Sequence, residues 1–282
     1  MSRPEHAAAP EIFYNEEQAA KYSINSRIIS VQSEMSKRAI QLLALPDDKS
    51  CFLLDIGCGS GLSGQILTEA GHQWIGIDIS KAMLDIAQNG REVSGDLILG
   101  DIGNGLPFVP GSFDGAISIS AIQWLCHSNS RDENPKKRLL HFFQTLYACL
   151  CRGTRAVFQF YPETVEQSEL ISSYAMRAGF TGGLVIDYPN STKAKKIRIS
   201  NYVLLKFFRI YLVLMTGGQQ HLPRALTSFN KENNHIPSIE RRVFGIKKNK
   251  SDLAKGSKAW IKAKKERARK RGKQLYIHAT LN

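Results

Sequence analysis

The chain has 282 residues, 43% of them hydrophobic, which is enough for one or two domains with a buried core. Its formal net charge is +13, and the whole excess lies between Arg241 and Lys273, where 15 Lys/Arg accompany two acidic residues. Secretion and membrane insertion are not expected, because the first ten residues lack an apolar core and the most apolar segment, 203–215, is interrupted by Lys206 and Arg209.

The five cysteines form no Cys-x-x-Cys pair. An odd number of cysteines in a chain without a secretory leader is typical of reduced intracellular thiols. Cys149 and Cys151 could together bind a metal, but no histidine or second cysteine pair stands beside them in the sequence. We therefore expect no metal site.

The region before residue 51 predicts helices. Glu16 to Tyr22 has a short helical pattern, and Ser26 is a candidate cap for a second helix with an apolar stripe that ends near Leu43. Helices in this position could close over a ligand pocket. Tyr14 and Tyr22 would then either line that pocket or simply pack between the helices.

The first strongly patterned segment is a strand, a glycine-rich turn and a helix. Cys51 to Ile56 is an apolar run typical of a strand buried on both faces, and Leu62 to Ala70 predicts a helix. Between them stand Gly57, Gly59 and Gly61, which can adopt positive φ and let a ligand approach the backbone. The pattern indicates the start of a nucleotide-binding βαβ unit, although a glycine turn by itself is equally consistent with a purely structural role.

Acidic residues follow the next two predicted strands. Asp78 ends the strand that begins at Gln73, 23 residues after Asp55, close to the interval at which such a unit places a carboxylate beside a ribose. Asp101 follows the strand Asp96 to Leu99, where it could lie near an adenine amino group. The turn lacks the last glycine of Gly-x-Gly-x-x-Gly, which argues against a dinucleotide-binding dehydrogenase.

A fourth strand, Phe113 to Ile119, leads into the loop 120–125, the best place for contacts with an acceptor substrate. In this loop Trp124 could stack on a base or serve as a partly buried anchor. The remaining expected elements alternate between helices and strands, and they are the helix Lys136 to Leu150, the strand Arg155 to Phe160, the helix Glu163 to Ala178, the strand Gly182 to Asp187 and the strand Tyr211 to Met215.

From about residue 50 to residue 190 these ordered motifs resemble the class I S-adenosylmethionine (SAM) methyltransferases. The resemblance implies an α/β, Rossmann-like fold: a mostly parallel seven-stranded sheet with helices on both faces and an antiparallel last strand. It also implies a cofactor site for SAM, with acceptor positioning by Gln123 and Trp124. The residues implied in cofactor binding are Asp55, Gly57, Cys58, Gly59, Gly61, Asp78, Ile79, Asp101, Ile102 and Ser118.

More local motifs narrow the resemblance to the eukaryotic 18S ribosomal RNA guanine-N7 methyltransferases of small-subunit biogenesis. They include Pro4-Glu5-His6, Asn25-Ser26-Arg27, Gln123-Trp124-Leu125-Cys126, Tyr161-Pro162-Glu163 and Asp187-Tyr188-Pro189-Asn190. The resemblance implies a guanine N7 in 18S or pre-ribosomal RNA as acceptor, and a heterodimer with a small zinc-binding activator subunit. It further implies residence in the nucleoplasm and nucleolus, with the cytoplasm as an additional location.

The expected chemistry requires no catalytic acid or base. Guanine N7 carries a lone pair and no proton, so alignment with the methyl group is sufficient. The loop after the fourth strand has no Asn-Pro-Pro-Tyr or Asp-Pro-Pro-Tyr motif of the kind that holds an exocyclic amine, and no catalytic cysteine pair suggests carbon-5 methylation. We therefore expect no catalytic residue in the strict sense.

The sequence predicts three regions: N-terminal helices over 1–50, a methyltransferase domain over 51–227, and a largely disordered basic tail over 228–282 for RNA binding and nuclear localisation. A solvated tail or a plain localisation signal is the alternative for the last region. Compared with the family that the chain resembles, residues 197–210 look like an insertion. Residues 275–282 stand where a basic C-terminal end is expected. The insert is expected to bulge out rather than to compete with the strand that follows it.

Two other functions remain open at this stage. A small-molecule SAM methyltransferase would have no use for a concentrated basic arm. A non-catalytic pre-ribosome assembly factor could use the same fold as an RNA-binding scaffold, and an intact cofactor motif alone does not exclude it.

Overall fold

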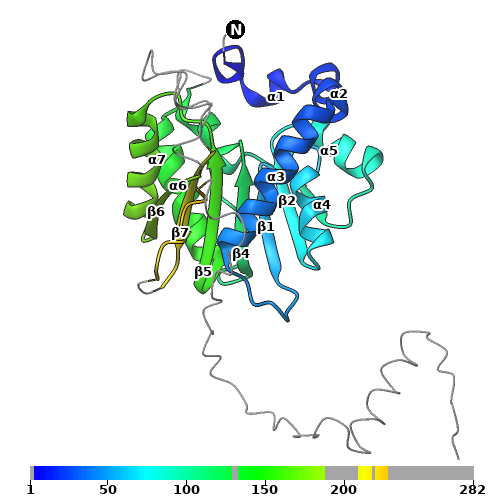
Figure 1. The fold of residues 1–282 in the computed structure, drawn as a ribbon. Coiled ribbons are helices and arrows are strands. Elements are labelled where there is room, and N and C mark those ends of the chain that lie inside the picture. The colour runs from blue at the N-terminus through cyan, green and yellow to red at the C-terminus, as the bar shows by residue number, and fades with distance from the viewer. Residues whose placement is uncertain (1–2, 129–132, 188–208, 218–219, 228–282) are drawn as a thin grey trace, which may run out of the picture. The chain divides into compact units, whose positions relative to one another are not determined.

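The computed structural model describes residues 3–128, 133–187, 209–217 and 220–227 (Figure 1). All of them belong to the first of the two units into which the chain divides, Met1–Glu240 and Arg241–Asn282. The predictions for the basic tail, and for residues 197–208 of the expected insert, lie outside the described residues.

Four helices of different lengths precede the sheet. They are η1 (Pro4–His6), α1 (Pro10–Phe13), α2 (Glu16–Ile24) and α3 (Ser26–Leu43). The predicted cap of α3 was wrong by one residue. The Asn25 side chain, not Ser26, accepts hydrogen bonds from the amides of Arg27 and Ile28, each at 3.1 Å. An asparagine oxygen at this position satisfies two amides that have no partner within the helix.

The remaining elements form an alternating α/β sequence. They are β1 (Phe52–Ile56), α4 (Leu62–Glu69), β2 (Gln73–Asp78), α5 (Lys81–Asp85), η2 (Ile86–Gly90), β3 (Asp96–Leu99), η3 (Ile102–Asn104), β4 (Phe113–Ile119), η4 (Ile122–Cys126), α6 (Pro135–Cys149), β5 (Leu150–Phe160), α7 (Val165–Arg177), β6 (Thr181–Asp187) and β7 (Arg209–Met215).

The strands form one seven-stranded sheet in the order β3-β2-β1-β4-β5-β7-β6. Strands β1 to β5 pair in parallel, whereas β7 runs antiparallel to both β5 and β6. The predicted fold class is confirmed. Because β1 and β4 are neighbours while the chain order reverses between them, the carboxyl ends of these strands flank the position where open α/β sheets bind ligands.

Two strands begin two or more residues before their predicted start. Strand β5 begins at Leu150 rather than Arg155, since Leu150 already pairs with Phe113 of β4. Strand β7 begins at Arg209, because Arg209 pairs with Asp187 and Ile210 is buried between β5 and β6. The last two residues of the expected insert are therefore part of the sheet, and the apolar character of Ile210 is explained by burial.

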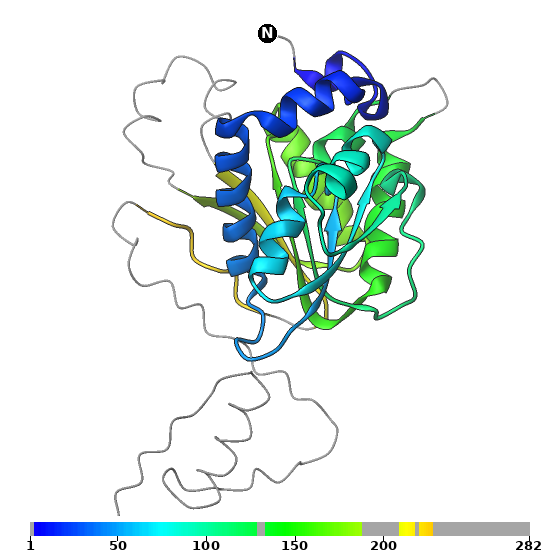
Figure 2. The same cartoon turned by 90° about the vertical axis from the view of Figure 1, so that its right-hand side faces the viewer.

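Helices cover both faces of the sheet (Figures 1 and 2). Helix α3 packs on β4, β5 and β7, next to α4, and its Met35, Ala39 and Leu42 are fully buried there. Helices α6 and α7 pack on the opposite face, where Phe142 and Phe143 enter a second core. Among the described residues, no helix combines the length and apolar character needed to cross a membrane.

A buried ion pair fastens α3 to the antiparallel edge of the sheet. The Arg38 guanidinium donates to the two carboxylate oxygens of Asp187 at 2.9 and 3.2 Å, and both side chains are almost completely buried. The Leu226 amide donates to the same carboxylate at 2.8 Å, so a segment that follows β7 is held at this point as well. An ion pair thus holds α3 to this edge of the sheet within an otherwise apolar interface.

Candidate cofactor site

The glycine turn after β1 is built so that the backbone itself forms a wall of the site. Gly57, Gly59 and Gly61 all have positive φ, at 68°, 53° and 79°. A Cβ on Gly57 would lie 2.3 Å from the Cβ of Ala121, which belongs to the loop after β4. The two loops therefore approach as closely as glycine permits, and a side chain at Gly57 would push them apart.

Asp78, at the end of β2, connects the glycine turn to the next loop. One carboxylate oxygen accepts from the Gly59 amide and the other from the Ser80 amide, each at 2.8 Å. The Ser80 hydroxyl in turn donates to the backbone carbonyl of Tyr14 at 2.8 Å, which holds the N-terminal segment here. Burial is the main influence on this carboxyl and raises the pKa of Asp78, while the backbone hydrogen bonds oppose that shift.

Asp101, after β3, already has strong partners. The Arg138 Nη2 atom donates to both of its carboxylate oxygens, at 2.7 and 2.8 Å, and the Gly103 amide donates at 2.8 Å. Arg138 also pairs with Glu133 at 3.0 Å. An adenine amino group beside Asp101 would thus meet a carboxylate whose position is fixed by α6.

These loops surround a pocket with an empty volume of ≈ 960 Å³, part of it open to solvent. The N-terminal segment contributes Pro10, Tyr14, Tyr22 and Gln32 to the lining of the pocket. Figure 2 shows α1 and α2 lying across the end of the sheet rather than against a face.

The structure brings most of the predicted site residues to this pocket. Its lining includes Gly57, Cys58, Gly59, Asp78, Ile79, Asp101, Ile102 and Trp124. Four predicted residues do not line it, and they are Asp55, Gly61, Ser118 and Gln123.

Asp55 lies beneath the glycine turn, fully buried within β1. Its carboxyl accepts from the Ser63 hydroxyl at 2.6 Å, and its other oxygen has no hydrogen-bond partner. Burial is the largest cause and raises the pKa of Asp55 to about 7, while the hydrogen bond from Ser63 opposes that shift. Asp55 is therefore placed to support the glycine turn and the start of α4, rather than to contact a ligand directly.

Gly61, Ser118 and Gln123 also lie just outside the pocket wall. Gly61 caps α4, and a Cβ there would lie 2.7 Å from the Val93 side chain. The Ser118 hydroxyl is buried without a partner. The Gln123 amide donates to the Ser120 carbonyl at 2.9 Å, so it shapes the loop after β4 from within.

Trp124 lines the pocket but is only 9% exposed. Its ring lies 6.0 Å from that of Phe13 and 5.8 Å from that of Tyr14, measured between centroids. The N-terminal segment therefore packs directly on the residue expected to position the acceptor. In this arrangement Trp124 is both a pocket wall and an anchor for the segment above it.

Sequence reasoning missed several lining residues, among them Ser60, Met83, Ser120 and Arg138. Ser120 has φ of 58°, unusual for a residue other than glycine, and its hydroxyl donates to Gln159 at 2.7 Å. Strained backbone of this kind often marks a functional loop, but no residue pattern announces it. Ser60 lies within the glycine motif, between Gly59 and Gly61, and its position there was the one available signal.

The donor and acceptor groups of the pocket suit a nucleoside with a short charged tail. The Ser60 hydroxyl is buried and, within the described residues, has no partner. The glycine turn exposes backbone, and Asp78 presents a carboxylate at the end of β2. Together with the strand order, this site defines a Rossmann-like, SAM-dependent methyltransferase of class I.

Comparisons with known proteins agree with that class. A methyltransferase-domain family matches residues 54–158. The chain resembles a Haemonchus contortus phosphoethanolamine N-methyltransferase 2 solved in complex with SAM, with a TM-score of 0.52 and 17% identity, covering 77% of this chain and 61% of that one. It also resembles a methyltransferase solved in complex with the Haloferax volcanii Trm112 methyltransferase activator, with a TM-score of 0.50 and 17% identity, over 72% of this chain and 97% of that one.

Closer relatives identify the family. The chain is 51% identical to the Mus musculus 18S rRNA (guanine-N(7))-methyltransferase over 276 residues, which cover 97% of this chain and 92% of that protein. A second family, described as a methyltransferase involved in Williams-Beuren syndrome, matches residues 214–279, which include the whole basic stretch 241–273. The chain belongs to the family of 18S rRNA (guanine-N7)-methyltransferases.

Proposed function

We propose that this protein transfers the methyl group of SAM to N7 of a guanine in 18S rRNA during biogenesis of the small ribosomal subunit. The observation that supports it best is the pairing of a methyltransferase pocket, with Asp78 and the glycine turn at its wall, with near full-length similarity to proteins that carry this name. SAM supplies an electrophilic methyl group on a sulfonium sulfur.

In this proposal the protein orients SAM and the acceptor guanine and does not activate the guanine by removing a proton. The Asp78 carboxylate accepts hydrogen bonds from the ribose hydroxyls, and the Gly57 and Gly59 backbone lets the rest of the cofactor lie against the end of β1. Guanine N7 has its own lone pair, so no side chain needs to remove a proton. The rate enhancement then arises from holding the acceptor in line with the methyl group.

Acceptor positioning is assigned to the loop after β4. Trp124 lies at the pocket wall, and Gln123 holds the backbone of Ser120 in the same loop. Because Phe13 and Tyr14 pack on Trp124, the N-terminal segment is placed to shape the entrance through which a base would pass. The proposed path therefore runs between that segment and the loop.

The basic stretch 241–273 is assigned to RNA binding and to nuclear and nucleolar localisation. Its 15 Lys/Arg against two acidic residues, in a chain that is otherwise neutral, form the electrostatic footprint of a phosphate-binding arm. A nuclear and nucleolar location follows from the proposed substrate, since the related proteins act on 18S rRNA.

A small zinc-binding activator subunit is the proposed protein partner. The structural relative from the Haloferax volcanii complex is a methyltransferase solved together with the Trm112 methyltransferase activator, and it shares the fold of this chain. We assign the same kind of heterodimer to the present protein.

The test is methyl transfer from labelled SAM to 18S rRNA by the full chain co-expressed with the activator. Two matched RNA preparations are used, one with guanosine and one with 7-deazaguanosine, which lacks N7. We expect transfer only to the first. Equal transfer to both would contradict N7 as the acceptor, and SAM binding by calorimetry without any transfer would favour the non-catalytic assembly factor.

The role of the tail is tested with a chain that lacks residues 241–282. We expect weaker RNA binding and a shallower dependence of affinity on salt, because phosphate contacts set that slope. SAM affinity should be unchanged. Equal salt slopes for the two proteins would exclude the tail as the RNA-binding arm.

A further inference from the structure

The first residues of the chain form a strap across the end of the sheet. At one end the Arg3 guanidinium donates to the Tyr161 carbonyl in the loop after β5. At the other end the Tyr14 carbonyl accepts from the Ser80 hydroxyl in the loop after β2. Between these points the strap, residues 3–14, contributes Pro10 and Tyr14 to the pocket.

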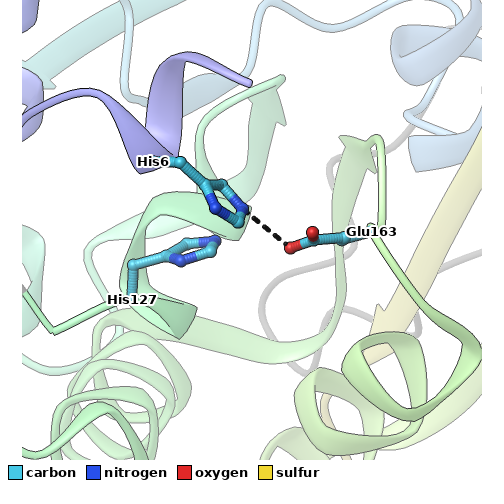
Figure 3. Close-up of side chains that lie close together, drawn as sticks. All are labelled: His6, His127 and Glu163. Carbon is cyan, nitrogen blue, oxygen red and sulfur yellow. Dashed lines mark hydrogen bonds and ion pairs between the residues drawn. The ribbon is translucent and has the colours of Figure 1, made fainter. Parts of the chain in front are cut away.

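Next to Arg3, two imidazoles and a carboxylate converge (Figure 3). His6 closes η1 in the strap, His127 follows η4, and Glu163 precedes α7. One ligand atom from each lies within 4.8 Å of the others, and the His6 Nε2 atom is 3.0 Å from a Glu163 carboxylate oxygen. The centroids of the two imidazole rings are 5.1 Å apart. The three side chains are partly accessible, so an ion could reach them.

We propose that His6, His127 and Glu163 form a binding site for a divalent transition-metal ion of the zinc class. Two imidazole nitrogens and one carboxylate oxygen are ligands that Zn²⁺ prefers, with water in the fourth position. Bonds of roughly 2.0–2.2 Å place tetrahedral ligands about 3.4 Å apart. The widest separation here is therefore too long by about 1.4 Å, which rotation of partly exposed side chains can close.

The charges around the site favour a cation. Two carboxylates, Glu5 and Glu163, and one guanidinium, Arg3, lie close enough to His127 to act on it electrostatically. The guanidinium is engaged by Glu5 at 3.4 Å and by the Tyr161 carbonyl.

The consequence is a clamp made of three chain segments. The ion would tie the strap to the loop after η4, which follows Trp124, and to the loop after β5. A simple hydrogen bond between His6 and Glu163 joins only two of these segments and uses no second imidazole. The participation of His127 is therefore what distinguishes the metal site from an ordinary polar contact.

The experiment titrates the full chain, freed of metal with a chelator, against Zn²⁺ in competition with a chromophoric chelator. The variants are His127→Asn, His6→Ala and Glu163→Gln. The matched control is His221→Asn, which changes an exposed histidine that is not part of the cluster. We expect one tight equivalent for the unchanged chain and for the control. Each ligand variant should weaken binding by more than the roughly 10–100-fold typical of a lost outer-shell partner.

Two further readouts keep the result decisive. Zn²⁺ should raise the melting temperature of the unchanged chain and the control but not of His127→Asn, whose circular dichroism verifies folding. Co²⁺ should give a tetrahedral visible spectrum without a thiolate charge-transfer band, which separates this site from the five cysteines. Equal Zn²⁺ affinity for all four variants, or a thiolate band on the tight equivalent, would overturn the proposal.

Discussion

Two aspartates at strand ends, Asp78 in β2 and Asp187 in β6, show how differently the two halves of the sheet use the same side chain. Asp78 accepts backbone amides from Gly59 and Ser80 and faces the pocket. Asp187 accepts the Arg38 guanidinium and the Leu226 amide and is 1% exposed. Within the described residues no cation pairs with the first carboxylate, whereas Arg38 neutralises the second.

The difference follows from what each half must do. On the β1–β2–β3 side the strands are parallel, and their carboxyl ends place the glycine turn, Asp78 and Asp101 at the wall of the pocket. On the β5–β7–β6 side the antiparallel strands must be fastened to α3, and a buried ion pair does this at a site no ligand reaches. A buried pair is costly to break because the remaining charge has no partner. Stability and binding are thus expected to separate between the two halves.

The largest effect is expected for Asp187→Ala. Removing this carboxylate leaves the Arg38 guanidinium buried without its charge partner, and the free energy of unfolding should fall by about 3–5 kcal/mol. Urea denaturation of the folded protein measures this. The control is Glu34→Ala, which breaks the exposed pair between α3 and Arg209 and should cost roughly 0–1 kcal/mol. Similar losses of unfolding free energy for Asp187→Ala and Glu34→Ala would contradict the distinction between the buried and the exposed ion pair.

Gly57→Ala tests the close approach on the binding side. The left-handed backbone costs about 1–2 kcal/mol for alanine, and the contact with Ala121 adds about 1–3 kcal/mol. SAM affinity should fall as well, because the turn and the loop after β4 separate. Gly71→Ala is matched in backbone, with φ of 85°, but its Cβ would meet nothing within 4 Å. Gly71→Ala should show only the loss of stability caused by the left-handed backbone, and calorimetry should find its SAM binding retained.

Asp78→Ala should weaken SAM binding by roughly 1.5–3 kcal/mol, the loss typical of a hydrogen bond to a charged acceptor. The Gly59 and Ser80 amides also lose their partner, so a moderate loss of stability is expected in addition. Asp85→Ala serves as control, since Asp85 forms only an exposed pair with Lys81 at 2.6 Å. Calorimetry with SAM compares the two. Unchanged affinity in a folded Asp78→Ala protein would remove Asp78 from the site.

The last prediction concerns the pH dependence of stability at Asp55, whose buried carboxyl has one oxygen without a hydrogen-bond partner among the described residues. Its pKa is raised from 3.8 to about 7, so between these values the folded chain holds a proton that the unfolded chain has released. Stability contributed by Asp55 is therefore present at low pH and lost as pH rises toward 7. Relative to Asp55→Asn, the unchanged chain should lose up to about 1.4 kcal/mol per pH unit in this window. Parallel pH profiles in urea denaturation would show that Asp55 stays ionised.

The central βαβ unit was predictable because its signals are local. An apolar run, glycines at Gly57 and Gly59, and acids at Asp78 and Asp101 each report on the backbone within a few residues. Parallel strands then bring their ends together without further information. The fold class followed for the same reason. The helix cap at Asn25 and the start of β7 at Arg209 were missed because each depends on one hydrogen bond or one strand partner.

The sequence by itself determined the strand–turn–helix core, the positions of the acids at strand ends and the uneven charge, since all of these are carried by neighbouring residues. Only the tertiary structure decided which distant side chains meet. Arg38 reaches Asp187, Arg138 takes up Asp101, and His6 lies beside His127 and Glu163. Each of these contacts joins segments more than 30 residues apart, as the residue numbers show. Such contacts depend on how helices pack on the sheet, and no local pattern encodes that packing.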